Sequence, residues 1–319
     1  MLRRRRLDLD RASLLIVFLL LPFSLYAVMV LWPFVQAVSY SLTSWSGFSP
    51  DKPFIGLDNY TELLGDETFR TAVRNSLVLL VVLPIVTLGI AFAFAVLVTV
   101  GGPSAGGVRG VRGSAFYRVV SFFPYVIPAI VVGLVWAQAY DPNSGLLNGV
   151  LTNAGLDQFE AYAWLGEKRT AMAATIGVAV WGMVGFYMVL FIAAIQGIDR
   201  EVLEAARLDG AGRVRISRSI VAPYLAGSVR AAYIYIGIFA LDCFVYVQAL
   251  NSTGGPDNST LVITQQIYTT AFTKGDFGKA CAMGVVLALL TFAFVGILQL
   301  VSRIRSRGTT PVTPMGGVR

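Results

Sequence analysis

The polar stretch at residues 201–225, EVLEAARLDGAGRVRISRSIVAPYL, separates two apolar segments that are each long enough to cross a membrane. Asp199 precedes it and is a typical N-cap residue, because its carboxylate can accept hydrogen bonds from the free amides of a first helical turn. Gly210 can adopt the left-handed conformation that ends a helix, and Pro223 suits the start of the next one. The stretch therefore predicts a short helix, a turn and a second short helix that leads into a membrane span.

The composition is that of a membrane protein. Of the 319 residues, 56% are hydrophobic and 13% are charged, which excludes an ordinary soluble domain. Apolar runs of about 20 residues can cross the roughly 30 Å hydrocarbon core of a bilayer. The chain has no histidine, so a histidine base, metal ligand or pH switch is excluded. Cys243 and Cys281 both fall in apolar segments and predict neither a structural disulfide nor a metal site.

We predict an all-α, polytopic membrane protein with six transmembrane helices. Pro124 and Pro128 should kink or unwind the third span, because proline removes a backbone donor and neighbouring helices can satisfy the freed carbonyls. The first apolar run is too long for a signal peptide and is expected to be retained. A short helix is expected around Asp58–Leu64, in the loop after it. The spans are expected at residues 13–32 with an amphipathic extension towards 42, and at 72–100, 116–140, 170–196, 226–250 and 280–301.

Arginines are distributed unequally between the two sides of the predicted membrane. Seventeen arginines lie on the side of the termini, against seven lysines and arginines in the three opposite loops. The positive-inside rule then makes both termini and the 201–225 stretch cytoplasmic. This topology, rather than binding to nucleic acid, explains the formal charge of +7. The predicted organisation is a basic cytoplasmic N-terminus at 1–12, a six-span domain at 13–303 and a flexible cytoplasmic tail at 304–319.

Two functions of the 201–225 stretch fit its residues equally well. Ala205 and Ala206 leave a low surface around which a groove of a soluble partner can close, so the first helix could act as a lever that moves both attached spans. The alternative is an amphipathic connector that rests on anionic lipid through the arginines at 207, 213, 215 and 218. The residues alone leave both functions open.

The spacing within this stretch resembles a known family signature. Glu204-Ala205-Ala206, three residues, Gly210, nine residues, Ile220, one residue and Ala222-Pro223 look like the EAA motif. This motif marks the membrane subunits of binding-protein-dependent ATP-binding-cassette (ABC) importers; Ala222 departs from it, since the family usually has leucine there. Other stretches are similar to the maltose-type first permease subunit of the carbohydrate branch, and the resemblance covers roughly residues 13–305. These stretches are FIGLDNY (54–60), FFPYVIPAIVVGLVW (122–136), GLLN (145–148), DGAG (209–212) and TGGPDNST (253–260).

The resemblance implies that several chains share the work of transport. In the family, the motif helix docks into a cleft on a cytoplasmic ATPase, which makes Glu204, Ala205, Ala206 and Gly210 the expected coupling residues of a coupling segment at 199–223. The expected partners are a second, related permease subunit, two cytoplasmic ABC ATPase subunits and an extracytoplasmic solute-binding protein. ATP-driven closure of the ATPases would switch the cavity by alternating access.

ATP hydrolysis is expected outside this chain. The sequence has no Gly-x-x-x-x-Gly-Lys-Ser/Thr loop, the motif that cradles nucleotide phosphates. ATP and Mg²⁺ would therefore be used by the partner ATPase, and this chain would be no enzyme and hold no cofactor or metal of its own. Since the family is chiefly prokaryotic, the expected location is the plasma or inner membrane of a prokaryote.

A face of the fifth span is the candidate substrate pathway. Asp242 is the acidic residue expected deepest in a span, and an intramembrane carboxylate usually faces a cavity or a partner. Tyr235, Phe239, Asp242 and Tyr246 follow one another at spacings of 4, 3 and 4 residues, which places them on one face of a continuous helix. Aromatic rings can cover the apolar side of a sugar, and a carboxylate accepts paired hydrogen bonds from its hydroxyls.

Trp181 and Tyr187 on the fourth span are further candidates for the pathway. The alternative for all of these residues is packing inside the helix bundle. The expected substrate is a mono- or oligosaccharide, including an amino sugar. A rival function is a secondary transporter or channel that runs on an ion gradient with Asp242 as the coupling group, and another is a membrane anchor without transport activity.

Overall fold

The computed structural model describes residues 16–100 and 113–307. The predicted N-terminal segment at 1–12, the arginines at 109 and 112 and the tail from residue 308 lie outside these ranges. Within them the chain is helical apart from loops and one isolated antiparallel bridge between Thr43 and Phe54. The predicted all-α class is therefore confirmed.

The described chain divides into two compact units. The first unit contains the chain up to Asp66 together with Ile267–Ala288, and the second contains Glu67–Gln266 and the chain from Leu289 onward. The helices of the first unit are η1 (Ile16–Leu20), α2 (Leu21–Tyr26), η2 (Ala27–Leu31), α3 (Trp32–Tyr40), α4 (Asp58–Gly65) and η6 (Thr269–Thr273). Two helices belong to both units, α15 (Ile263–Tyr268) and α16 (Phe277–Arg307).

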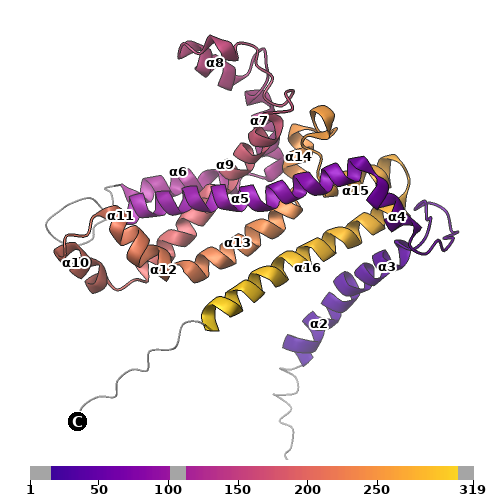
Figure 1. The fold of residues 1–319 in the computed structure, drawn as a ribbon, viewed down its shortest axis with the longest axis horizontal. Coiled ribbons are helices and arrows are strands. Elements are labelled where there is room, and N and C mark those ends of the chain that lie inside the picture. The colour runs from indigo at the N-terminus through magenta and orange to yellow at the C-terminus, as the bar shows by residue number, and fades with distance from the viewer. Residues whose placement is uncertain (1–15, 101–112, 308–319) are drawn as a thin grey trace, which may run out of the picture. The chain divides into compact units, whose positions relative to one another are not determined.

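The second unit holds most of the long helices. Its elements are α5 (Glu67–Thr99), α6 (Ser114–Val126), α7 (Ala129–Ala139), α8 (Leu146–Asn153), η3 (Asp157–Phe159), α9 (Ala171–Gln196), α10 (Arg200–Leu208), α11 (Arg213–Ile216), η4 (Ser217–Val221), α12 (Ala222–Tyr224), α13 (Ala226–Leu241), α14 (Phe244–Leu250) and η5 (Pro256–Asn258). Figure 1 shows α10 and α11 at one end of α5, and α8 beyond α7, away from them.

Four helices of the described residues are long and apolar enough to cross a membrane, namely Ile16–Tyr40, Glu67–Thr99, Ala171–Gln196 and Phe277–Ile304. The number rises to six if each of two bent pairs is counted as one span. These pairs are α6 with α7, bent by 97°, and Arg213–Tyr224 with α13, bent by 71°. The first bend confirms the predicted proline kink, since the backbone leaves the helix at Ile127 and Pro128 is the N-cap of α7.

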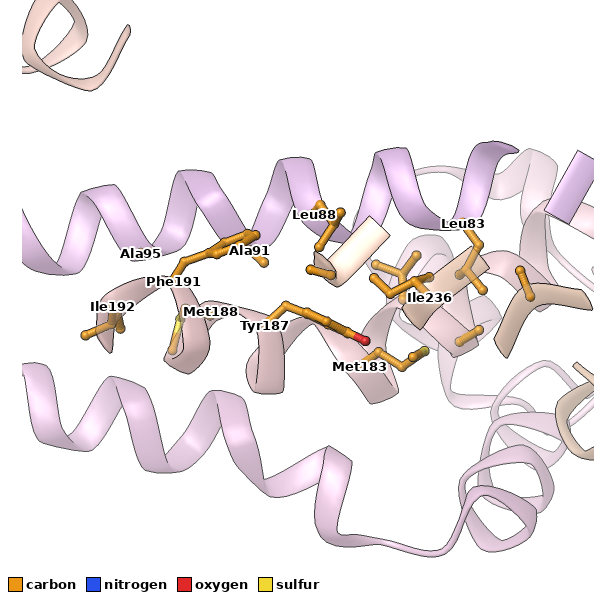
Figure 2. Packing of buried hydrophobic residues seen from close by; sticks show 14 of the residues in the cluster. Leu83, Leu88, Ala91, Ala95, Met183, Tyr187, Met188, Phe191, Ile192 and Ile236 are labelled. Atoms are coloured by element: carbon orange, nitrogen blue, oxygen red, sulfur yellow. The ribbon is translucent and has the colours of Figure 1, made fainter. Parts of the chain in front are cut away.

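The core of the second unit lies between α5, α9 and α13. In Figure 2, residues of α5 from Leu83 to Ala95 face α9, and Ile236 of α13 packs beside them. Phe191 of α9 and Ile236 are fully buried. Ala91 and Ala95 are small, which lets α5 and α9 approach each other closely, as small residues do in membrane helix pairs. The outer faces of α6 and α7 stay apolar and exposed, for example at Phe123.

The segment between α7 and α9 is a compact subdomain built around Asn148. This buried side chain donates hydrogen bonds to the carbonyls of Pro142 (3.1 Å) and Tyr162 (3.0 Å) and accepts one from the Trp164 indole (2.6 Å). The ring of Trp164 also stacks on Phe159 at 5.2 Å between centroids. An amide whose donors and acceptor are all engaged gives this subdomain one defined conformation.

Asp141 begins the same subdomain with a hydrogen-bonded turn. Its carboxylate accepts bonds from the amide of Ser144 (2.8 Å), the hydroxyl of Ser144 (3.0 Å) and the amide of Asn143 (3.0 Å). These bonds favour the ionised form and hold the pKa of Asp141 below its usual value, with Ser144 as the largest cause.

The loop after α14 is fixed to the start of α5. The Asn75 amide donates to the carbonyls of Asn258 and Leu261, both at 2.9 Å, and the Ile263 amide donates to the Ser76 hydroxyl at 3.1 Å. The loop needs this support because Asp257 and Asn258 have positive φ angles, a conformation that side chains other than glycine rarely adopt.

The first unit has its own polar clamp. The Asn59 amide donates to the carbonyls of Ser41 (2.8 Å) and Thr43 (3.0 Å), which joins the predicted short helix, observed as α4, to the end of α3. Lys279 of α16 pairs with Glu62 at 3.1 Å. At its far end α16 continues to Arg307, so residues 304–307 of the predicted flexible tail are helical.

Candidate functional site

The 201–225 stretch folds into the predicted helix, turn and second helical segment. Asp199 is the N-cap of α10, and its carboxylate accepts a hydrogen bond from the Glu201 amide at 3.1 Å. Gly210 ends α10 with φ at +78°. The Ala211 amide then donates to the Ala206 carbonyl at 2.9 Å, which is the bond of a Schellman turn. Both boundaries of α10 therefore follow from the residue types that predicted them.

One face of α10 is buried and the other is exposed. Leu203 is 4% exposed and packs into the core of the second unit, which holds α10 in place. Ala206 packs partly against the same core. Glu204, Ala205, Leu208 and Gly210 are exposed, and Leu208 reaches 89%. We call these four residues the α10 surface. It contains three of the four predicted coupling residues, whereas Ala206 is turned partly inward.

The α10 surface is exposed and has a low profile. Glu204 and Leu208 are four residues apart and lie on one side of the helix, with the small Ala205 next to them. A Cβ atom built on Gly210 would meet no atom within 4 Å, so the end of the helix is open to a partner. A large apolar side chain that is nearly fully exposed at a helix end suits protein contact.

Two hydrogen bonds connect the 201–225 stretch to the ends of long helices. The Arg213 guanidinium donates through Nε to the carbonyl of Val100, the residue after α5, at 2.7 Å. The Tyr224 hydroxyl donates to the carbonyl of Gly197, the residue after α9, at 2.9 Å. A cation suits the free carbonyls at the end of a helix. Sequence reasoning missed both contacts, because it used the arginines to orient the chain and as lipid contacts and assigned no role to Tyr224.

The predicted fifth span is interrupted at Asp242, which corrects the prediction of a continuous helical face. The α13 helix ends at Leu241, and the Asp242 amide caps it by donating to the carbonyls of Ile238 (3.2 Å) and Phe239 (3.1 Å). The Phe244 amide then donates to the Asp242 carbonyl at 2.8 Å, and α14 begins. No glycine or proline marks this break in the sequence, so the helical spacing could not reveal it.

The break separates the four residues of the predicted face. Tyr235 is 71% exposed and Asp242 is also exposed, whereas Tyr246 is 5% exposed. Phe239 remains beside Tyr246, with 6.0 Å between their ring centroids. The Tyr246 side chain lies against α9 at Gly182, where an added Cβ atom would be 2.6 Å from the tyrosine hydroxyl oxygen. Glycine at 182 therefore makes room for Tyr246.

The two candidates on α9 differ in their surroundings. Tyr187 is buried in the core between α5, α9 and α13 (Figure 2). This position fits the alternative that Tyr187 packs inside the helix bundle. Trp181 is partly exposed and meets Trp136 of α7 edge-on at 5.5 Å between ring centroids. Of the six predicted pathway residues, Asp242, Tyr235 and Trp181 are the ones that this chain leaves accessible. An exposed carboxylate can accept hydrogen bonds from sugar hydroxyls, and an exposed aromatic ring can cover the apolar face of a sugar.

Comparison with known proteins gives a consistent result. The family model described as "Binding-protein-dependent transport system inner membrane component" matches residues 66–307. The diacetylchitobiose uptake system permease protein NgcF of Streptomyces coelicolor is 56% identical over 306 residues, which cover 96% of this chain and 87% of that protein. The multiple sugar-binding transport system permease protein MsmF of Streptococcus mutans is 32% identical over 285 residues, covering 89% and 92%.

The fold also resembles a solved structure. A chain of a bacterial alginate ABC transporter, in complex with an alginate pentasaccharide-bound periplasmic protein, superposes with a TM-score of 0.79 at 20% identity. The match covers 95% of this chain and 98% of that one. At this identity the likeness concerns the fold.

Proposed function

Because this chain belongs to the family of binding-protein-dependent transport system inner membrane components, we propose that it is the transmembrane permease subunit of an ATP-driven sugar importer. In this proposal it forms half of the translocation pathway and a second, related permease subunit forms the other half. An extracytoplasmic solute-binding protein delivers the sugar, and two cytoplasmic ATPase subunits use ATP and Mg²⁺. The identity of 56% to a sugar uptake permease over 96% of the chain supports it.

The proposed topology has six spans and a cytoplasmic α10. One bent helix pair, α6 with α7, is counted as the third span. The other, Arg213–Tyr224 with α13, is counted as the fifth span together with the segment that leads into it. The excess of arginine on the side of the termini and of α10 supports a cytoplasmic location for both termini and the coupling segment.

The α10 surface is the proposed docking site for the ATPase. Its exposed Glu204, Ala205 and Gly210 carry this proposal, since they are available to a partner while Leu203 anchors the same helix. A push on α10 would pass to α5 through the Arg213–Val100 bond and to α9 through the Tyr224–Gly197 bond. Because α13 follows directly, three long helices would move when the ATPases close, as alternating access requires.

Gly210→Arg tests this docking. The left-handed backbone at Gly210 makes a side chain unfavourable by about 1–2 kcal/mol, too little to unfold a domain of typical stability. A Cβ atom at Gly210 would meet nothing within 4 Å, so the variant should insert normally but lose the ATPase in a pull-down. Gly155→Arg, just after α8, is the matched control, because Gly155 also has a left-handed backbone and nothing within 4 Å of its Cβ position. Recovery of the ATPase at wild-type yield with Gly210→Arg would refute the docking site.

Transport itself is tested in proteoliposomes that contain the assembled transporter. Diacetylchitobiose, the sugar named for the Streptomyces coelicolor relative, is the first substrate to try, with unrelated sugars as competitors. Uptake should need ATP on the ATPase side and should survive an uncoupler. Uptake that is driven by an ion gradient without ATP would favour the rival secondary transporter.

Asp242 is the proposed polar group of the sugar pathway. Its exposed carboxylate sits at the break between α13 and α14, where it can accept hydroxyl hydrogen bonds. Asp242→Asn keeps the shape and part of the hydrogen bonding, so uptake should fall less than with Asp242→Leu. Equal uptake by Asp242→Leu and the wild type would exclude Asp242 from the pathway.

A further inference from the structure

An open apolar groove lies between α5, the α12–α13 segment and α16 within the second unit. Its volume is about 630 Å³, within the range of ligand sites in proteins. On the opposite side from α5 it is bounded by Val229, Tyr233 and Leu298. Its α5 wall follows the i, i+3, i+4, i+7 pattern of one helical face, with the residues Ile85, Leu88, Gly89 and Phe92.

Small residues keep this groove hollow. Gly89, Ala222 and Ala226 all line it, and a Cβ atom built on Gly89 would meet nothing within 4 Å. The large residue Ile85 is exposed along the groove. An apolar hollow of this kind in a membrane protein is filled by an apolar molecule, since water would leave its walls without partners.

The lining of the groove includes a cation. Arg230 lines the groove one turn into α13, and its guanidinium donates to the hydroxyl of Ser302. This partner is neutral, so the contact leaves the positive charge of Arg230 uncompensated. Arginine in a pocket between membrane helices is a typical partner for an anionic lipid head group.

We propose that the groove binds an anionic phospholipid, with an acyl chain along α5 and the phosphate at Arg230. The walls from Pro84 to Phe92 correspond to about 12 Å of helix at the usual rise. The charge of Arg230 favours this occupant, since an apolar helix of a second permease subunit would leave the guanidinium without a counter-charge. The proposal goes beyond the transport function and does not depend on ATPase docking.

Native mass spectrometry of the detergent-purified, assembled transporter tests the proposal. The transporter is mixed with phosphatidylglycerol and phosphatidylcholine of the same acyl chains, and the bound lipids are counted. The wild type should retain phosphatidylglycerol in preference. Arg230→Gln should lower this preference about fivefold, since one basic residue near an anionic lipid contributes about 1 kcal/mol. Arg230→Lys keeps the charge and should keep most of the preference.

A substitution that fills the groove tests whether an acyl chain binds along α5. Gly89→Leu should reduce the binding of both lipids, because its side chain occupies the space that Gly89 leaves open. Gly227→Leu is the matched control: Gly227 also has nothing within 4 Å of its Cβ position, and it does not belong to the groove lining. An excess of inorganic phosphate should not displace the lipid, because phosphate lacks the acyl chain.

Three results would overturn the lipid site. These are equal retention of the two lipids by the wild type, equal binding by Gly89→Leu and Gly227→Leu, and displacement of phosphatidylglycerol by inorganic phosphate. The last result would assign Arg230 to a free anion. The ATPase pull-down on the same preparations keeps this outcome separate from a failure of the docking site, since Gly89 and Arg230 do not belong to the α10 surface.

Discussion

Replacing Arg213 with methionine should loosen the coupling segment from the end of α5. Arg213 Nε donates to the Val100 carbonyl at 2.7 Å, and Val100 is 1% exposed. A hydrogen bond to a charged group contributes about 1.5–3 kcal/mol, and the buried carbonyl would lose its partner. At about 1.4 kcal/mol per factor of ten, the equilibrium constant for local opening of the segment should rise about 10- to 150-fold.

Hydrogen exchange of the assembled transporter measures this opening directly. Amides of residues 213–221 should exchange faster by the same factor, because exchange of a locally opening segment follows its opening free energy. Arg215→Met is the matched control, since Arg215 is exposed on the same short helix. Arg213→Lys keeps the charge without the guanidinium geometry and should fall between the two.

A second measurement connects the contact to function. If Arg213 transmits movement from α10 to α5, the transporter that carries Arg213→Met should hydrolyse more ATP for each sugar transported, while the ATPase remains bound. The reasoning is refuted if Arg213→Met and Arg215→Met exchange at the same rate. It also fails if exchange rises as expected while the ATP used per sugar stays at the wild-type value, because the contact would then be structural only.

Three further substitutions test packing and polar contacts. Gly182→Leu should push the Tyr246 hydroxyl off α9 and destabilise the unit by about 1–3 kcal/mol through overpacking, seen as a lower thermal midpoint, whereas Gly89→Leu should not. Asn148→Leu leaves the Trp164 indole and two carbonyls without partners; we expect a loss of about 2–4 kcal/mol and a change in tryptophan fluorescence. Since hydrogen bonding lowers the pKa of Asp141, its turn should keep full stability above the usual carboxyl range and lose it as the pH falls through the lowered pKa. Exchange of amides 143–148 across this pH range measures the loss, and Asp141→Asn should abolish the pH dependence.

Much of the fold could be predicted because its signals are local. The apolar runs mark the long helices, Pro124 and Pro128 mark the bend of 97°, and Asp199 and Gly210 mark both ends of α10. Each of these residues acts on the backbone within about one helical turn. Their effect therefore does not depend on what packs around them.

The candidate site was harder to predict because it depends on distant contacts. The break at Asp242 has no proline or glycine to mark it, so the spacing of Tyr235 and Tyr246 suggested one face where the structure has two environments. The Arg213–Val100 bond joins residues separated by 113 positions, and no local pattern reveals such a pair. Asn148 shows the same limit, since its partners come from both sides of a loop.

The break at Asp242 also bears on how the subunit enters the membrane during synthesis. The α13 helix has 16 residues and measures about 24 Å, less than a bilayer core of roughly 30 Å. Arg230 lies near its start and Asp242 at its end, so the segment would partition weakly into lipid when it leaves the translocon alone. Because α5 and α9 are synthesised before α13, their packing faces are available when α13 leaves the translocon. We therefore expect insertion of α13 to depend on its contacts with α5 and α9 as well as on its own hydrophobicity.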